Sequence, residues 1–154
     1  MKSHEVTDIV RLCSDVITRY THFVDLGEAE RVPELFTEDG LFTTPTEEHK
    51  GQEALSTRFK FVAEEAVRLP WVLRHVCTNV LVDAVSPEEA TATVYVTIYR
   101  HDGPVDGPAP VAGPTKIGRY RDRLVKTDRG WRFAERHFSL DFDATATSAG
   151  TLRS

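Results

Sequence analysis

The spacing of hydrophobic residues changes at Pro70, and this change limits the folds open to the chain. Before Pro70, apolar residues recur every three or four positions, as on one face of a helix. After it come four segments rich in β-branched and aromatic residues, separated by turn signals such as Ser-Pro at 86–87 and Asp-Arg-Gly at 128–130. Helices followed by strands at hairpin spacing predict an α+β domain, with the helices on one face of a mostly antiparallel sheet.

Three helical segments are expected before Pro70. The first, over 6–24, is predicted by an apolar stripe formed by Val6, Ile9, Cys13, Val16, Tyr20 and Phe23. A short helical piece over 28–36 contains Pro33, which should start, kink or break a turn. The third begins at Gly51 and ends before Pro70, and a short strand over 41–44 precedes it.

Long strands are predicted over 71–83, 90–100, 116–126 and 131–142. The segment 102–114 has too many Gly and Pro residues to continue a ladder, so it should be a long hairpin loop, either a lid or a passive surface excursion. We expect one domain over 1–142 and a flexible C-terminal tail over 143–154, which has almost nothing to bury.

Composition argues against several classes of partner. The chain has 19 Lys and Arg against 24 Asp and Glu, with no basic run, so nucleic acid is not an expected partner. Its apolar runs are far shorter than the ~20 residues that cross a bilayer, and the first helix is charged from its start, unlike a signal peptide. We therefore predict a cytoplasmic protein without a membrane contact.

Motifs for metals and cofactors are missing from the sequence. Cys13 and Cys77 lack the CxxC or zinc-finger spacing, which predicts two buried free thiols. No pair of histidines has an HExxH-like spacing, and there is neither a Gly-rich phosphate loop nor a GxSxG elbow. The prediction is a protein with no metal and no cofactor.

Three polar residues, Asp25, His75 and Asp122, stand where the pattern expects apolar ones. By the period of two, one strand face carries Leu73, His75, Cys77, Asn79 and Leu81, and another carries Gly118, Tyr120, Asp122 and Leu124. If both faces point inward, their polar groups line one cavity. An Asp-His pair there can remove and return a proton, because an unperturbed imidazole titrates near neutrality, and the Tyr20 hydroxyl can polarise a substrate oxygen.

Each of these residues also has a structural interpretation. A buried polar group needs only a hydrogen-bond partner, Asp25 could cap or pair near a helix end, and Asp122 could form a surface ion pair within its Arg-rich run. Arg136 and His137 are adjacent, so at most one faces inward unless a bulge intervenes, and the sequence leaves open which one. His49 and His101 fall in or beside loops and are expected to be solvated.

Several strings, in this order, resemble the SnoaL-like branch of the nuclear-transport-factor-2-like (NTF2-like) superfamily over residues 8–142. They are Tyr20 to Asp25 ahead of Gly-Glu at 27–28, LFTEDG at 35–40, KGQEA at 50–54, Arg74-His75 with Asn79, and GRYRD at 118–122 before GWRF at 130–133. The resemblance implies a cone-shaped fold with three N-terminal helices packed on a curved, mostly antiparallel sheet. Its members include scytalone dehydratase, bile acid dehydratase, ketosteroid isomerase, limonene epoxide hydrolase, polyketide cyclases and small subunits of ring-hydroxylating dioxygenases, so fold alone does not specify activity.

The resemblance also implies a catalytic set. The dehydratases carry a Tyr and an Asp on the first helix and a His on the first long strand, and Tyr20, Asp25 and His75 match these positions. We expect His75 as general acid/base, Asp25 as the group that orients and charges it, and Tyr20 on a substrate oxygen. The expected substrate-binding residues are Trp71, Phe59, Asn79, Tyr120, Asp122, Arg136 and Phe138.

Because of two departures from the family pattern, the sequence does not identify the general acid that would protonate the leaving group. The strand 93–99 lacks the Asp of bile acid dehydratase, and 115–117 lacks the second His of scytalone dehydratase. The prediction is a cofactor-independent dehydratase, isomerase or cyclase for a hydrophobic polycyclic or polyketide-like small molecule, with the substrate and the choice of reaction left open. The alternatives are a non-catalytic small-molecule-binding module and a dioxygenase small-subunit-like structural partner. A homodimer through the outer sheet face fits the family and the apolar positions Val72, Val76 and Val80.

Overall fold

The computed structural model describes residues 1–144, so most of the tail predicted over 143–154 lies outside the described residues. Three helical segments lie before the four long strands, namely α1 (Ser3–Asp25), the 3₁₀ helix η1 (Ala29–Leu35) and, after the short strands β1 and β2, α2 (Gly51–Arg68). The strands are β1 (Phe36–Thr43), β2 (Glu48–Lys50), β3 (Trp71–Ser86), β4 (Glu89–Asp102), β5 (Lys116–Thr127) and β6 (Gly130–Asp143). The three helical segments and four long strands are therefore as predicted, and β2 is an addition.

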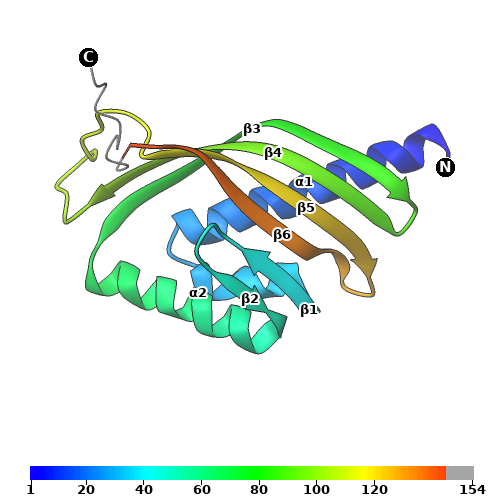
Figure 1. Cartoon of the computed structure of the whole chain (residues 1–154), viewed down its shortest axis with the longest axis horizontal. Coiled ribbons are helices and arrows are strands. Elements are labelled where there is room, and N and C mark those ends of the chain that lie inside the picture. Colours follow the sequence, from blue (N-terminus) through cyan, green and yellow to red (C-terminus); the bar gives the residue numbers. More distant parts are fainter. Residues whose placement is uncertain (145–154) are drawn as a thin grey trace, which may run out of the picture.

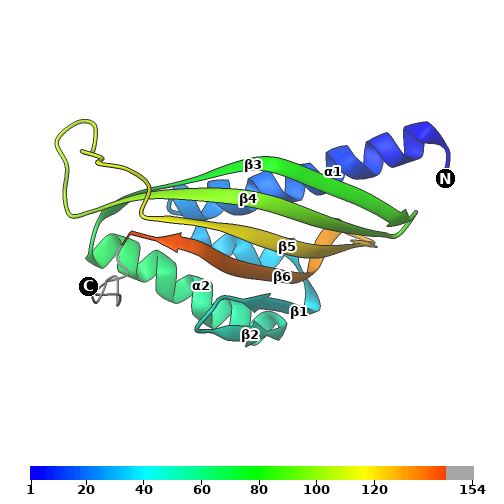
Figure 2. The same cartoon turned by 45° about the horizontal axis from the view of Figure 1, so that its top comes forward.

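The six strands form one curved sheet in the order β2-β1-β6-β5-β4-β3. Every pair is antiparallel except β1 and β6, which are parallel. Both helices lie on one side of the sheet, with α1 running along β3 and α2 beside β1 and β2 (Figure 1). The predicted α+β class is confirmed. Figure 2 shows the β4–β5 connection as a long loop that extends past the sheet at the end opposite the N-terminus.

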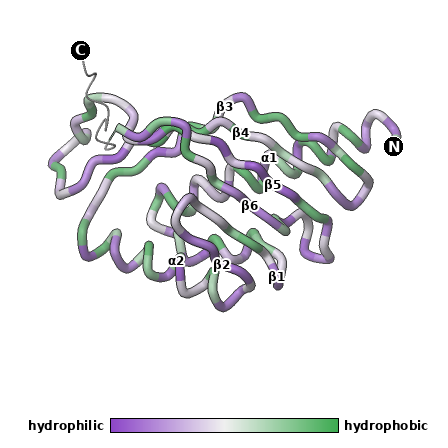
Figure 3. Tube along the Cα trace, viewed as in Figure 1, coloured by the Kyte–Doolittle hydropathy of each residue, from purple (hydrophilic) through white to green (hydrophobic). Residues whose placement is uncertain are grey.

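The core lies between the helices and the inner face of the sheet. On α1 the predicted stripe is buried at Ile9, Cys13, Val16, Tyr20 and Phe23, whereas Val6 is only half-buried. Hydropathy alternates along the strands (Figure 3), because only alternate side chains face the helices. On β5 the predicted inward set of Gly118, Tyr120, Asp122 and Leu124 is buried as expected.

A bulge in β3 changes which side chains face inward. The ladder with β4 shifts register between Thr78 and Leu81, and Asn79 has a φ of 50°. An extra residue moves every later side chain to the opposite face. His75 and Cys77 face inward as predicted, but Asn79 is exposed and Leu81 is 60% exposed. The prediction that Leu73, His75, Cys77, Asn79 and Leu81 share one face is wrong beyond Cys77.

A second bulge, in β6, answers which of Arg136 and His137 faces inward. Phe133 and Glu135 pair with consecutive residues of β5, which leaves Ala134 as the extra residue. Arg136 is fully buried beneath the sheet. His137 lies on the other face, where its Nδ1 is 2.8 Å from the Thr43 hydroxyl.

Among residues 1–144, both long helices lie on the inner side of the sheet and no helix covers its outer face. Val76 and Val80 are 43% and 42% exposed there, so their place in a homodimer contact stays a prediction. Cys13 is buried, Cys77 is half-buried, and neither forms a disulfide. Over residues 1–144, none of the helices has the length and the apolar character needed to cross a membrane.

Candidate active site

Asp25 and His75, which are 50 positions apart in the chain, meet where the end of α1 packs on β3. The Asp25 carboxylate accepts two hydrogen bonds from His75: Oδ2 from the backbone N–H at 2.7 Å, and Oδ1 at 2.6 Å from ring Nδ1. The two side chains are only 8% and 9% exposed. The predicted pair therefore exists as a geometric unit.

This geometry fixes the tautomer of the imidazole. An ionised carboxylate can only accept hydrogen bonds, so the ring nitrogen that faces Asp25 carries the proton. The lone pair of the neutral ring is then on Nε2. Because the backbone N–H binds the same carboxylate, the ring and its strand are held together. His75 is thus arranged to take a proton at Nε2 while its other side stays fixed.

Asp25 occupies a position where a carboxylate gains nothing from its own helix. It is the last residue of α1, where the helix dipole is negative and disfavours an anion. Gly27, with a φ of 82°, turns the chain away, and the Glu28 N–H bonds to the Phe23 carbonyl at 2.8 Å. The two bonds from His75 are what hold the carboxylate in place, so the pairing outweighs an unfavourable local position.

A pocket of about 590 Å³ opens beside His75. His75 lines it, whereas Asp25 lies behind the ring and does not. The pocket is of the size that suits a drug-sized ligand, and it is mainly aromatic and aliphatic. Its apolar lining consists of Val24, Phe42, Phe59, Phe61, Val62, Trp71, Leu73, Ile98 and Phe138, with the rings of Tyr20 and Tyr120.

Four of the predicted substrate-binding residues, Phe59, Trp71, Tyr120 and Phe138, line this pocket. Phe138 can lie against β5 because Gly118 has no Cβ, which would otherwise meet the Phe138 ring and the Ser139 carbonyl. Trp71 stacks with the guanidinium of Arg100, whose carbon is 4.3 Å from the ring centroid. Asn79 does not line the pocket, because the bulge turns it to the surface.

Tyr20 lines the same pocket and is 4% exposed. It is packed against Phe59 and Tyr120, with ring centroids at 6.1 and 5.8 Å. Burial raises the pKa of Tyr20 to about 12, although the charges of Arg136 and Arg58 and a side-chain hydrogen bond with Tyr120 act in the opposite direction. The hydroxyl therefore keeps its proton near neutral pH and can donate a hydrogen bond.

Asp122 and Arg136 were predicted to bind substrate, but they do not line the pocket. Their side chains are 0% exposed and form an ion pair with Arg136 Nε 3.3 Å from Asp122 Oδ1. The guanidinium carbon is 4.2 Å from the Tyr20 centroid and 3.8 Å from that of Tyr120. The two tyrosines thus separate the pair from the pocket. For Asp122, the ion-pair interpretation is right, but the pair is buried and not at the surface.

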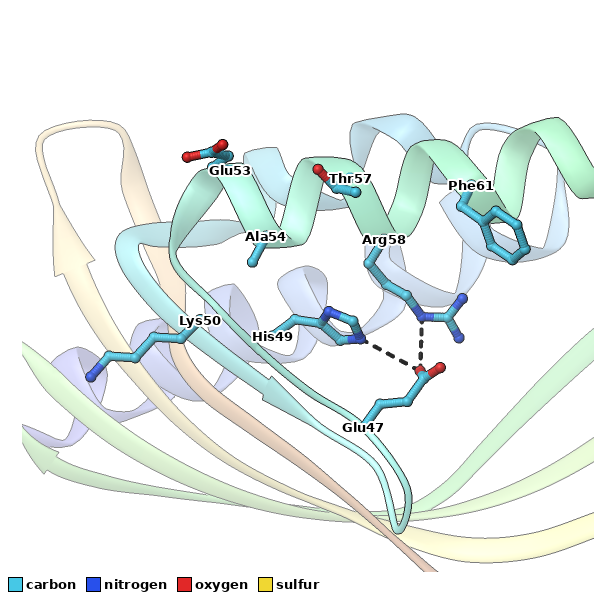
Figure 4. Close-up of a pocket in the computed structure, with 8 residues that line it drawn as sticks. All are labelled: Glu47, His49, Lys50, Glu53, Ala54, Thr57, Arg58 and Phe61. Atoms are coloured by element: carbon cyan, nitrogen blue, oxygen red, sulfur yellow. Dashed lines mark ion pairs between the residues drawn. The ribbon is translucent and has the colours of Figure 1, made fainter.

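Five charged pocket residues were not predicted: Arg58 and Glu65 from α2, Arg100 and Asp102 from β4, and Lys116 from β5. They stand on exposed or mixed positions of their elements, so no break in an apolar pattern marks them. His49, expected to be solvated, instead lies on β2 with a side chain 22% exposed and its ring stacked on Phe42. It lines an outer hollow of about 620 Å³ between β2 and α2 (Figure 4).

A metal ion in a protein site is usually held by several His, Cys, Asp or Glu side chains. Across the described part of the chain, residues 1–144, no three of these side chains gather closely enough to form such a site. The chemistry that the site can perform with its own groups is proton transfer at His75 and hydrogen-bond donation from Tyr20.

Three solved structures share this architecture. A candidate scytalone dehydratase from Novosphingobium aromaticivorans has a TM-score of 0.69 at 21% identity, covering 92% of this chain and 91% of that one. An NTF2-like protein with a cystatin-like fold from the same organism has a TM-score of 0.68 at 23% identity, with coverages of 90% and 84%. LinA has a TM-score of 0.68 at 19% identity, with coverages of 94% and 99%.

These likenesses confirm the NTF2-like fold that the sequence predicted. No protein with a curated description matches the chain in sequence. The family comparison matches the SnoaL-like domain over residues 6–137, which covers α2, all but the first three residues of α1, all but the end of the sheet, and every residue of the site described above except Phe138. The chain therefore belongs to the family of SnoaL-like domains.

Proposed function

We propose that the protein is a cofactor-independent acid/base enzyme, a dehydratase, isomerase or cyclase, that acts on a hydrophobic polycyclic or polyketide-like small molecule. The observation that carries the proposal is the hydrogen-bonded Asp25-His75 pair, placed so that only His75 lines the pocket. Membership of the SnoaL-like family and the fold shared with a candidate scytalone dehydratase support it.

In the proposed reaction His75 Nε2 takes a proton from a carbon of the substrate, and the negative charge of Asp25 stabilises the imidazolium that forms. Tyr20 donates a hydrogen bond to a substrate oxygen, which gains electron density as the C–H bond breaks. In a dehydration the imidazolium returns the proton to a β-hydroxyl, which leaves as water when the C–O bond breaks. In an isomerisation the same proton goes to a different carbon.

The first test is deuterium exchange in D₂O, followed by NMR on a panel of bicyclic ketones and β-hydroxyketones. Exchange reports proton removal from carbon whichever reaction follows it, and mass spectrometry then detects loss of water. His75→Ala should remain folded and slow the exchange by at least ~100-fold, the usual contribution of a general base. The matched control is His137→Ala, which removes a histidine from the opposite face of the sheet and should exchange like the wild type.

Exchange that survives in His75→Ala would show that the assignment is wrong. Tight binding of the ketones without exchange in the wild type would instead favour a non-catalytic small-molecule-binding module. Co-purification with a large iron-containing subunit would favour a dioxygenase small-subunit-like role.

A further inference from the structure

Arg58 stands in the wall between two hollows of the molecule. It projects from α2 and lines the outer hollow beside β2 (Figure 4). It also lines the pocket that contains His75. Its side chain is 26% exposed, so the charge is neither sealed in the core nor free in solvent. A cation at such a wall can contact a ligand inside the pocket while being held from outside.

Within residues 1–144, a single ion pair holds the guanidinium. Its Nε is 3.0 Å from Glu47 Oε2, the same oxygen that lies 3.5 Å from His49 Nε2. This Nε is buried and lacks a well-aligned hydrogen bond. In Figure 4 the dashed line from Arg58 to Glu47 starts at Nε, and within residues 1–144 no hydrogen bond involves the two terminal nitrogens. Four N–H donors of Arg58 are thus available to a ligand.

The charges of the pocket leave Arg58 without an acidic partner inside it. Arg100 pairs with Asp102 at 2.7 Å, and Glu65 pairs with Arg68 at 2.6 Å. Glu47, the partner of Arg58, lines the outer hollow and not the pocket. Arg58 and Tyr20 line the same pocket. The positive charge of Arg58 lowers the pKa of the Tyr20 hydroxyl against the effect of burial, as expected of two side chains that lie near each other.

We propose that Arg58 and Tyr20 together bind one oxygen atom of the substrate and stabilise negative charge on it, which makes the substrate an enolisable ketone. The inference rests on the proposed function. When His75 Nε2 takes the proton from the carbon beside the carbonyl, the C–H electron pair forms a C=C bond and the carbonyl oxygen becomes an enolate. The enolate re-forms the carbonyl as a β-hydroxyl takes that proton and leaves as water, so that an α,β-unsaturated ketone remains.

The experiment uses 4-nitrophenol as the probe, because its phenolate resembles an enolate and its visible absorbance reports the ionised fraction. The neutral reference ligand is 4-nitrotoluene, which has a similar shape and no oxyanion. At a pH where 4-nitrophenol is ionised, the wild type should bind it at least ~10-fold tighter than 4-nitrotoluene, since hydrogen bonds to charged groups are the stronger ones. Equal affinity for the two probes would overturn the proposal.

Arg58→Gln should remove that preference, and Arg58→Lys, which keeps the charge without the forked donors, should keep part of it. Lys60→Gln is the matched control: it removes one positive charge from an exposed site on the same helix, 73% exposed, and should bind like the wild type. An unchanged preference in Arg58→Gln would overturn the proposal. His75→Ala should keep the preference, so a failure of the proton-transfer hypothesis and a failure of the oxyanion site give different results.

Discussion

Two pairs of ionisable side chains lie on the inner side of the same sheet, and their contacts differ. Asp25 and His75 are joined by two short hydrogen bonds, and His75 lines the pocket. Asp122 Oδ1 and Arg136 Nε are 3.3 Å apart, and both side chains are buried from solvent. Within the described residues, no aligned hydrogen bond reaches either carboxylate oxygen or any guanidinium nitrogen of this pair. The first pair fixes the orientation of the His75 ring, while the second is a buried ion pair packed against aromatic rings.

The difference suits two different tasks. Hydrogen bonds are directional, so the first pair can hold an imidazole in one tautomer and one orientation. The guanidinium of Arg136 instead lies against the faces of Tyr20, Tyr120 and Phe133, where the attraction depends on charge and ring position. We therefore expect the first pair to affect catalysis directly and the second to affect stability and the placement of the tyrosines.

The sharpest test of the first pair is Asp25→Asn. The amide keeps the shape of the carboxylate but loses its charge and can present N–H donors, so it no longer fixes the proton on Nδ1. We expect ketone exchange to fall by about 10²- to 10⁴-fold, the range of general acid-base catalysis. Nitrogen NMR of the His75 ring should show the Nδ1–H form in the wild type and a different tautomer balance in the variant.

Asp15→Asn is the control for that experiment, because Asp15 belongs to an exposed ion pair with Arg19 on the same helix. It should leave both the exchange rate and the His75 tautomer unchanged. Should Asp25→Asn exchange at the wild-type rate, the two pairs would not differ in function as their geometry suggests.

For the second pair we expect a large loss of stability from either single change. Asp122→Leu leaves a buried guanidinium without a counter-charge, and Arg136→Met leaves a buried carboxylate, each costing about 3–5 kcal/mol of unfolding free energy. The double variant has apolar side chains of similar volume and should lose far less than the sum of the singles. Urea denaturation of the four proteins measures this cycle. Additive losses would mean that the two charges do not depend on each other.

The buried pair should also leave a signature in the pH dependence of stability. Burial raises the pKa of Asp122 from 3.8 to about 6, although the charges of Arg136 and His137 oppose the shift. Between about pH 4 and pH 6 the folded protein then binds more protons than the unfolded chain, so the contribution of Asp122 to stability falls as pH rises through this window. The loss is about 3 kcal/mol at 1.36 kcal/mol per pKa unit. Urea denaturation at both ends of the window should show this loss in the wild type and not in the double variant.

The sequence predicted the parts of the site that depend on local periodicity. Asp25 and His75 break an apolar pattern on a helix end and a strand, and the pattern places both on inner faces. Arg58 breaks no pattern on α2, and its role depends on which elements surround that helix, which is a property of the tertiary fold. Bulges were missed because one extra residue near Asn79 or Ala134 reverses the alternation without a distinctive residue type.

The smallest effect concerns the Asn79 bulge, which separates the inward part of β3 from the part that faces outward. With a φ of 50°, Asn79 is in the left-handed region, which Asn tolerates and a β-branched residue resists. Asn79→Val should lower the free energy of unfolding by about 1–2 kcal/mol, whereas Asn79→Gly should change it by less than about 1 kcal/mol. The exchange rate should stay at the wild-type value in both, because His75 is fixed by Asp25 on the other side of Cys77. Thr78→Val is the control and should exchange like the wild type. A fall in exchange for Asn79→Val alone would mean that the bulge, and not the Asp25 carboxylate, sets the orientation of His75. The directional role of the Asp25-His75 pair would then be due to the backbone of β3.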